Sequence, residues 1–126
     1  MKVQQDTRKI LLLDVMSTLV YDPFYKEMPA FFGMNLQELI SQIKPGEWVT
    51  FEHGRIDENT FLCNFFADGR SYDHSAFMAL LHESYAWLDG IESLLQELNA
   101  QDVEMHTFSN YPVWYKIIED RLQLSQ

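Results

Sequence analysis

The sequence predicts an α/β fold in which a small parallel sheet is interrupted by a helical insert. A continuous apolar run at residues 10–15 is typical of a strand that is covered on both faces. From residue 23 to about residue 87, apolar and aromatic side chains recur at helical spacing. A helix at 91–98, a strand at 103–108 and a helix at 113–122 then restore the alternation of α/β proteins.

The first predicted strand carries an acidic side chain near its carboxyl end. Asp14 interrupts the apolar run, and Thr18 follows four positions later, across a tight loop. Open α/β sheets bind their ligands at the carboxyl ends of the strands, so Asp14 is a candidate functional residue. A carboxylate held there by local hydrogen bonds can act as a nucleophile. The alternative is an aspartate that only caps the following turn.

The insert is expected to contain four short helices, at residues 36–43, 47–53, 58–67 and 74–85. Asn35, Asp57 and Asp73 are placed to act as N-caps of three of them. Aromatic side chains on these helices are interpreted as packing of the insert in preference to a binding pocket; they are Trp48, Phe51, Phe61, Phe65 and Phe66. Cys63 lies in the same stripe and is expected to be a small core residue.

The second predicted strand ends at Ser109 and Asn110. A hydroxyl and backbone amides at a strand-to-helix junction can hold an anionic oxygen. The alternative is that the two residues only cap the last helix, which has Pro112 in its expected first turn. Adjacent parallel strands would bring Asp14 and Ser109 to the same edge of the sheet.

Composition excludes several classes of function. The chain has 126 residues, with 9 Lys and Arg against 19 Asp and Glu, a net charge of −10. This charge argues against binding to nucleic acid or to an anionic membrane surface. A single cysteine precludes an intrachain disulfide and fits a reducing compartment. Residues 1–9 lack the apolar segment of a secretory signal, so a cytoplasmic location is expected, with an organelle address left open if the N-terminus is incomplete.

Other candidate sites are weaker. The glycines form neither a dinucleotide-binding nor a phosphate-binding loop, and the four histidines lack the spacing of a metal site. Arg55 and Arg70 lie in the insert, where an arginine could meet an anionic substrate. Solvated surface side chains are the favoured interpretation of both.

Residues 11–19 (LLLDVMSTL) resemble the first motif of the haloacid dehalogenase (HAD) superfamily, an apolar strand followed by Asp-x-Asp-x-Thr. Residues 103–110 (VEMHTFSN) resemble the second motif, an apolar strand that ends in Ser or Thr. Residues 48–61 (WVTFEHGRIDENTF) are similar to the helical cap of the dehalogenase and phosphoglucomutase-like branch, and residues 88–98 to its return into the core. The resemblance covers residues 9–124 in the family's order.

The resemblance implies a partial Rossmann-like core, formed by residues 1–21 and 88–126, with a helical cap at 22–87. Asp14 would attack phosphorus or carbon in a small phosphorylated or halogenated organic acid, and water would hydrolyse the aspartyl intermediate. Thr18 would support the nucleophile loop, while Ser109 and Asn110 would contact the substrate. Magnesium, held by Asp14 and the Met16 backbone carbonyl, is implied for the phosphatase branch, and no cofactor for the dehalogenases.

Two departures from the family pattern predict impaired activity. Met16 stands where the phosphatases have a second Asp, which protonates the leaving group and is worth about 10²–10⁴-fold in rate. The third and fourth motifs, a Lys and metal-binding acids, would follow the helix at 113–122, so a C-terminally truncated chain is expected. The alternative function is a non-catalytic short isoform or remnant that acts as an interaction module. Uncovered core surfaces also predict self-association.

Overall fold

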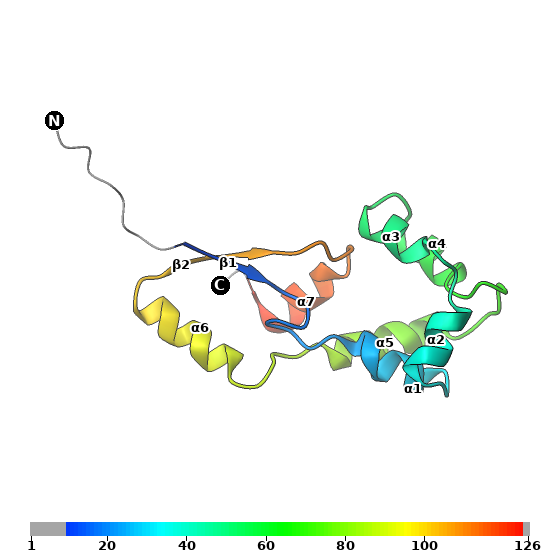
Figure 1. Cartoon of the computed structure of the whole chain (residues 1–126), viewed down its shortest axis with the longest axis horizontal. Helices are drawn as coiled ribbons and strands as arrows, with labels where there is room; N and C mark the ends of the chain where they lie inside the picture. The colour runs from blue at the N-terminus through cyan, green and yellow to red at the C-terminus, as the bar shows by residue number, and fades with distance from the viewer. Residues whose placement is uncertain (1–9, 125–126) are drawn as a thin grey trace.

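A computed structural model describes residues 10–124 (Figure 1). The predicted absence of a secretory signal at 1–9 therefore concerns residues outside the described part. The elements, in chain order, are β1 (Ile10–Asp14), the 3-10 helix η1 (Pro23–Tyr25), α1 (Glu27–Phe31), α2 (Leu36–Gln42), α3 (Glu47–Glu52), α4 (Glu58–Cys63), α5 (His74–Ser84), α6 (Ile91–Ala100), β2 (Glu104–Phe108) and α7 (Tyr115–Leu122).

The two strands form a parallel pair, which confirms the predicted α/β class. The register runs from Ile10 opposite Glu104 to Asp14 opposite Phe108. In Figure 1, α6 and α7 lie on the same side of this sheet. The other face is open, since the exposed fractions are 55% at Ile10, 73% at Leu12 and 70% at Phe108. The expectation that the first strand is covered on both faces is therefore wrong for the described residues, which place helices on one side alone.

The core lies mainly in the helices between β1 and α6, which are called the insert below, and in the loop that follows β1. Aromatic rings fill much of it, and the Phe51 and Phe61 rings stack with centroids 4.4 Å apart. The residues of the aromatic stripe therefore pack in the core, as predicted, and three of them also line a cavity. The prediction that Cys63 is a core residue is wrong, because its side chain is exposed. It occupies the last position of α4, while the neighbouring Leu62 turns into the core.

The predicted helix at 58–67 is four residues too long. After α4 ends, the chain pairs with the end of α2: the Lys44 amide donates to the Phe65 carbonyl at 2.9 Å, and the Ala67 amide to the Gln42 carbonyl at 3.0 Å. These tertiary hydrogen bonds flank an antiparallel β-bridge between Ile43 and Phe66, and Phe66 is buried. The helix stops because its next backbone groups are engaged elsewhere.

Three predicted helix starts are confirmed by their N-caps. Side-chain oxygens of Asn35, Asp57 and Asp73 accept hydrogen bonds from backbone amides three residues later, at 2.8, 2.8 and 2.9 Å. These bonds satisfy amides that have no partner within the helix. In residues 10–124, no helix has the length and apolar character needed to cross a membrane.

Helix α7 begins two residues later than predicted and packs against the insert. Trp114 is buried, and its indole Nε1 donates to Glu58 Oε1 at 2.7 Å. Farther along, Arg121 Nε donates to the Tyr85 carbonyl, also at 2.7 Å. The last helix therefore connects the sheet to α4 and to the end of α5.

Candidate functional site

The carboxyl end of β1 places a carboxylate beside a hydroxyl. Asp14 is the last residue of the strand, and the Thr18 hydroxyl donates to its Oδ2 at 3.1 Å. Both residues are exposed. A nucleophilic carboxylate needs this arrangement, in which one oxygen is fixed by a neighbour and the group remains accessible.

The loop after β1 is tight and well anchored. The Val15 carbonyl accepts hydrogen bonds from the amides of residues 18–20, at 2.8–3.3 Å, and the Ser17 amide donates to the Val20 carbonyl at 2.8 Å. Ser17 has a φ of 61°, a left-handed conformation that is uncommon for a residue other than glycine. Three side chains anchor the loop in the hydrophobic core, namely Val15, Leu19 and Val20, while Thr18 stays at the surface.

Ser109 lies at the same edge of the sheet as Asp14. It directly follows Phe108, the residue paired with Asp14, which confirms the predicted juxtaposition of the two chain positions. The Tyr111 amide donates to Ser109 Oγ at 3.2 Å. Neither Ser109 nor Asn110 caps the last helix, since the N-cap position of α7 is Trp114. That structural alternative is therefore wrong.

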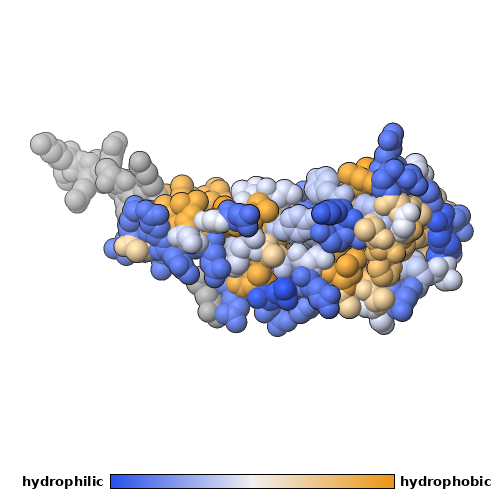
Figure 2. All heavy atoms as spheres, turned by 90° about the horizontal axis from the view of Figure 1, so that it is seen from below, coloured by the Kyte–Doolittle hydropathy of each residue, from blue (hydrophilic) through white to orange (hydrophobic). Residues whose placement is uncertain are grey.

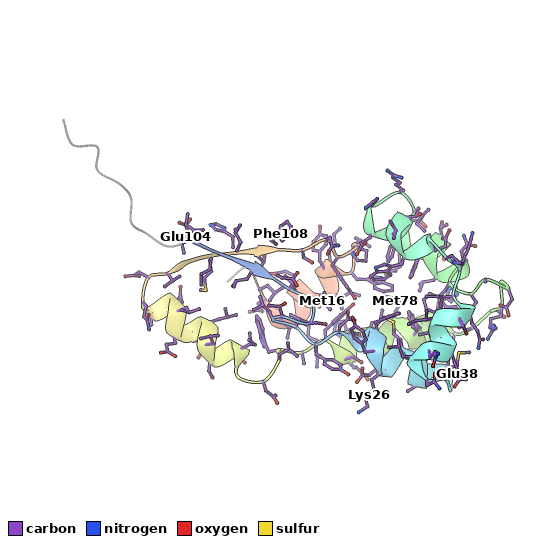
Figure 3. All side chains as sticks on the ribbon, in the orientation of Figure 1. Met16, Lys26, Glu38, Met78, Glu104 and Phe108 are labelled. Atoms are coloured by element: carbon purple, nitrogen blue, oxygen red, sulfur yellow. The ribbon has the colours of Figure 1, made fainter. Side chains whose placement is uncertain are left out.

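Met16 lies just beyond the end of β1, and Figure 3 shows it where the chain leaves the sheet. Its side chain is half-buried and packs against the hydrophobic core. Among residues 10–124, no three His, Cys, Asp or Glu side chains are grouped so that they could hold a metal ion. Asp14 and a backbone carbonyl fall short of the near-octahedral oxygen set that Mg²⁺ requires. The described residues do not by themselves form a magnesium site.

The candidate arginines differ in their surroundings. Arg70 folds back onto Asp68, with Nη2 2.7 Å from Oδ2, and its guanidinium lies 4.4 Å from the centre of the Phe66 ring. The hydrogen bond from Arg70 lowers the pKa of Asp68. Arg55 is exposed. Arg70 thus binds its own neighbours at the surface. This agrees with the prediction that both arginines are surface side chains.

A cavity lies between the insert and Trp114, and its wall includes Trp48, Phe61 and Phe65, for which packing was the favoured interpretation. Its volume is about 380 Å³, and its lining is largely aromatic and aliphatic: Asp22, Phe24, Tyr25, Met28, Ile40, Ile43, Lys44, Glu47, Trp48, Phe61, Phe65 and Trp114. These residues come from η1, α1 to α4, the start of α7 and the connecting segments. No spacing along the chain could have grouped them, since only the fold brings them together.

Two carboxylates in the cavity wall have different environments. Asp22 caps η1, accepting a hydrogen bond from the Phe24 amide at 3.0 Å, and burial raises its pKa. Glu47 pairs through Oε1 with Lys44 Nζ at 3.3 Å. Its other oxygen, Oε2, is buried and has no hydrogen-bond partner within the described residues. Such an atom calls for an explanation, because buried polar groups are nearly always paired.

Tyr111 connects the sheet edge with the cavity wall. Its amide binds Ser109, its hydroxyl lies 2.7 Å from the Tyr85 hydroxyl, and its ring centroid is 5.7 Å from that of Trp48. Burial raises the pKa of both tyrosines, so the two phenols stay neutral. The strand end and the cavity are therefore linked through one aromatic side chain.

Comparison with known proteins gives one informative relationship. The chain is 51% identical over 116 residues to flavin mononucleotide hydrolase 1, a chloroplastic protein of Arabidopsis thaliana. The match covers 92% of this chain and 47% of that protein, so the chain spans about half the length of the relative. No protein-family model matches the chain, and no solved structure matches it. The similarity supports the expected relationship to a hydrolase.

Proposed function

We propose that the chain carries the nucleophile of a HAD-like hydrolase that cleaves a phosphate monoester of the flavin mononucleotide class. The observation that carries this proposal is the hydrogen-bonded pair of Asp14 and Thr18 at the carboxyl end of β1, with Ser109 at the same edge. The name of the Arabidopsis relative supports a phosphorylated substrate over the halogenated acids that the sequence left open.

The chemistry follows from the two strand ends. Thr18 holds Oδ2 of Asp14, which leaves Oδ1 to attack phosphorus. The P–O bond to the alcohol breaks, the leaving oxygen takes a proton from solvent water, and a second water then hydrolyses the aspartyl phosphate to phosphate and Asp14. The Ser109 hydroxyl and the amides of residues 109 and 110 would bind the phosphoryl oxygens. Magnesium is the cofactor that the resemblance implies. Asp14 and the Met16 backbone carbonyl are the ligands that the described residues would offer it, and they form an incomplete set.

The proposed organisation is a Rossmann-like core, residues 1–21 and 88–126, with residues 22–87 as a helical cap. The connections between the two segments support it. The Tyr21 amide donates to the Ala86 carbonyl at 2.8 Å, and the Leu88 amide to the Leu19 carbonyl at 2.9 Å. The chain therefore enters and leaves residues 22–87 through two adjacent hydrogen-bonded segments, as an inserted unit would. By analogy with the relative, a plastid is the proposed location in preference to the cytoplasm.

A second candidate function is a non-catalytic interaction module. It is favoured by Met16, whose thioether cannot protonate a leaving group, and by the apolar face of the sheet that Leu12 and Phe108 leave exposed. Such a module would bind a partner with no turnover.

Hydrolysis of flavin mononucleotide, with 2-chloropropionate as the halogenated alternative, tests the proposal. The chain should release phosphate slowly and no chloride, and Asp14→Asn should abolish phosphate release. Asp89→Asn is the matched control, since Asp89 is an exposed carboxylate outside the site. Phosphate release that persists unchanged in Asp14→Asn would refute the nucleophile, and none from the unmodified chain would favour the interaction module.

A further inference from the structure

We propose that the cavity in the insert binds a planar heteroaromatic ring with a polarised N–H, and that Glu47 accepts the hydrogen bond from it. This inference rests on the proposed function in one respect: the ring would belong to the alcohol released from the phosphate ester. Neither the resemblance nor the relative's name assigns a role to Glu47 or to Lys44.

The walls of the cavity suit a flat ring. Its lining includes six aromatic side chains: Phe24, Tyr25, Trp48, Phe61, Phe65 and Trp114. Aromatic walls hold planar ligands by offset or edge-to-face ring contacts. A volume of about 380 Å³ falls in the range of small-molecule sites, about 300–1,000 Å³.

The polar groups in the wall define what the ring must carry. Glu47 Oε2 is buried without a partner in the described residues, and Lys44 Nζ lies 3.3 Å from the other oxygen of the same carboxylate. A ring N–H would supply the missing donor and form a charge-assisted hydrogen bond. A carbonyl next to that N–H would face the lysine. The pair therefore matches a cyclic imide or amide edge, such as that of a flavin.

Asp22, the other carboxylate in the wall, is a weaker acceptor for the ligand. The Phe24 amide already donates to its Oδ1, and burial raises its pKa, which favours the neutral carboxyl form. Glu47 is the acceptor that the fold leaves unused.

Tyr111 connects the cavity with the strand ends, so a single substrate molecule could occupy both. Tyr111 binds Ser109 through its amide and contacts Trp48 through its ring. A substrate with its ring in the cavity and its phosphate near Asp14 would need a spacer between the two ends, and Tyr111 is a residue that contacts both sides. The polyol chain of flavin mononucleotide is such a spacer.

Binding of riboflavin tests the inference without any hydrolysis, since riboflavin has no phosphate. Titration followed by quenching of flavin fluorescence should show saturable binding to the chain. Riboflavin methylated at the imide nitrogen should bind about tenfold more weakly, because it cannot donate to Glu47. Glu47→Gln should weaken riboflavin binding by a similar factor and leave the methylated compound unaffected.

The controls separate this inference from the proposed function. Glu38→Gln changes an exposed carboxylate on α2, far from Met16 in Figure 3, and should bind riboflavin normally. Asp14→Asn should also bind riboflavin, even though it hydrolyses nothing. If the chain binds riboflavin but does not hydrolyse flavin mononucleotide, the ring-binding site is supported and the proposed hydrolase function is refuted. Absence of binding, or equal binding of the two flavins to the unmodified chain, would overturn the ring site whatever the variants do.

Discussion

At the scale of single residues, some members of the site could be identified from the sequence, and others could be identified only from contacts in the folded chain. Asp14 ends the first apolar strand, and Thr18 and Ser109 come shortly after the two strands. Predicting the strands from hydrophobicity was therefore enough to predict that these residues meet at one edge of the sheet. Glu47 could not be found in this way. Its unpaired oxygen is a property of the packed insert, and in sequence it is only the acid that begins a short helix.

Met16→Asp should raise the rate of flavin mononucleotide hydrolysis by about 10²-fold or more, because a carboxyl group can protonate the leaving alcohol and a thioether cannot. The measurement is phosphate release at saturating substrate over a range of pH. Met16→Leu is the control and should leave the rate unchanged. An aspartate variant that folds normally and gains nothing would argue against a missing general acid.

Asp22→Asn should alter how stability depends on pH. Burial raises the pKa of Asp22 above its unfolded value of about 3.9, so its stabilising contribution is present below that pH and is lost as pH rises through the folded pKa. Asparagine does not titrate and can still accept from the Phe24 amide. The variant should therefore gain stability relative to the unmodified chain as the pH rises above the unfolded pKa of about 3.9.

Urea unfolding at several pH values measures this difference. Asp57 and Asp68 have lowered pKa values, through hydrogen bonds from Thr60 and Arg70 respectively, and their contributions are lost as pH falls. They are present in both chains, so they cancel in the comparison. A difference between the two chains that stays constant with pH would contradict the assignment.

At the scale of elements, helix starts were predictable and several boundaries were not. An N-cap is local, because Asn35 needs only an amide three residues away. The end of α4 and the start of α7 depend on distant partners, namely the pairing of residues 42–44 with 65–67 and the Trp114 bond to Glu58. Local sequence carries no record of such partners, so both predicted boundaries were displaced.

Asn35→Ala should lower the free energy of unfolding by about 1 kcal/mol, because the Glu38 amide loses its acceptor. Chemical denaturation gives the value. Gln37→Ala, at an exposed position inside the same helix, serves as the control and should have little effect. An equal effect of the two substitutions would show that the cap does not stabilise α2.

At the scale of the whole molecule, the parallel pairing and most of the element order were predictable from hydrophobic periodicity. The prediction of four helices in the insert was wrong, because η1 and α1 precede them. The distribution of burial was not predictable, because the apolar run of β1 gives the same pattern whether one face or two are covered. Ile10, Leu12 and Phe108 face solvent on the open side of the sheet. The face shown in Figure 2 is mostly hydrophilic, with hydrophobic side chains breaking it in separate places.

The open face of the sheet predicts self-association, as exposed apolar surface does in general. Leu12→Lys should reduce it by placing a charge at the most exposed of these aliphatic positions. Light scattering after size-exclusion chromatography, at rising concentration, gives the mass. A chain that remains monomeric at every concentration would contradict the prediction.

Trapping of the covalent intermediate shows whether Asp14 is the nucleophile. Borohydride reduces an acyl phosphate, so an aspartyl phosphate formed during turnover of flavin mononucleotide becomes homoserine, which peptide mass spectrometry locates. Homoserine is expected at residue 14, and none after Asp14→Asn. Phosphate release from the chain with no homoserine at residue 14, or with homoserine at another aspartate, would contradict this expectation.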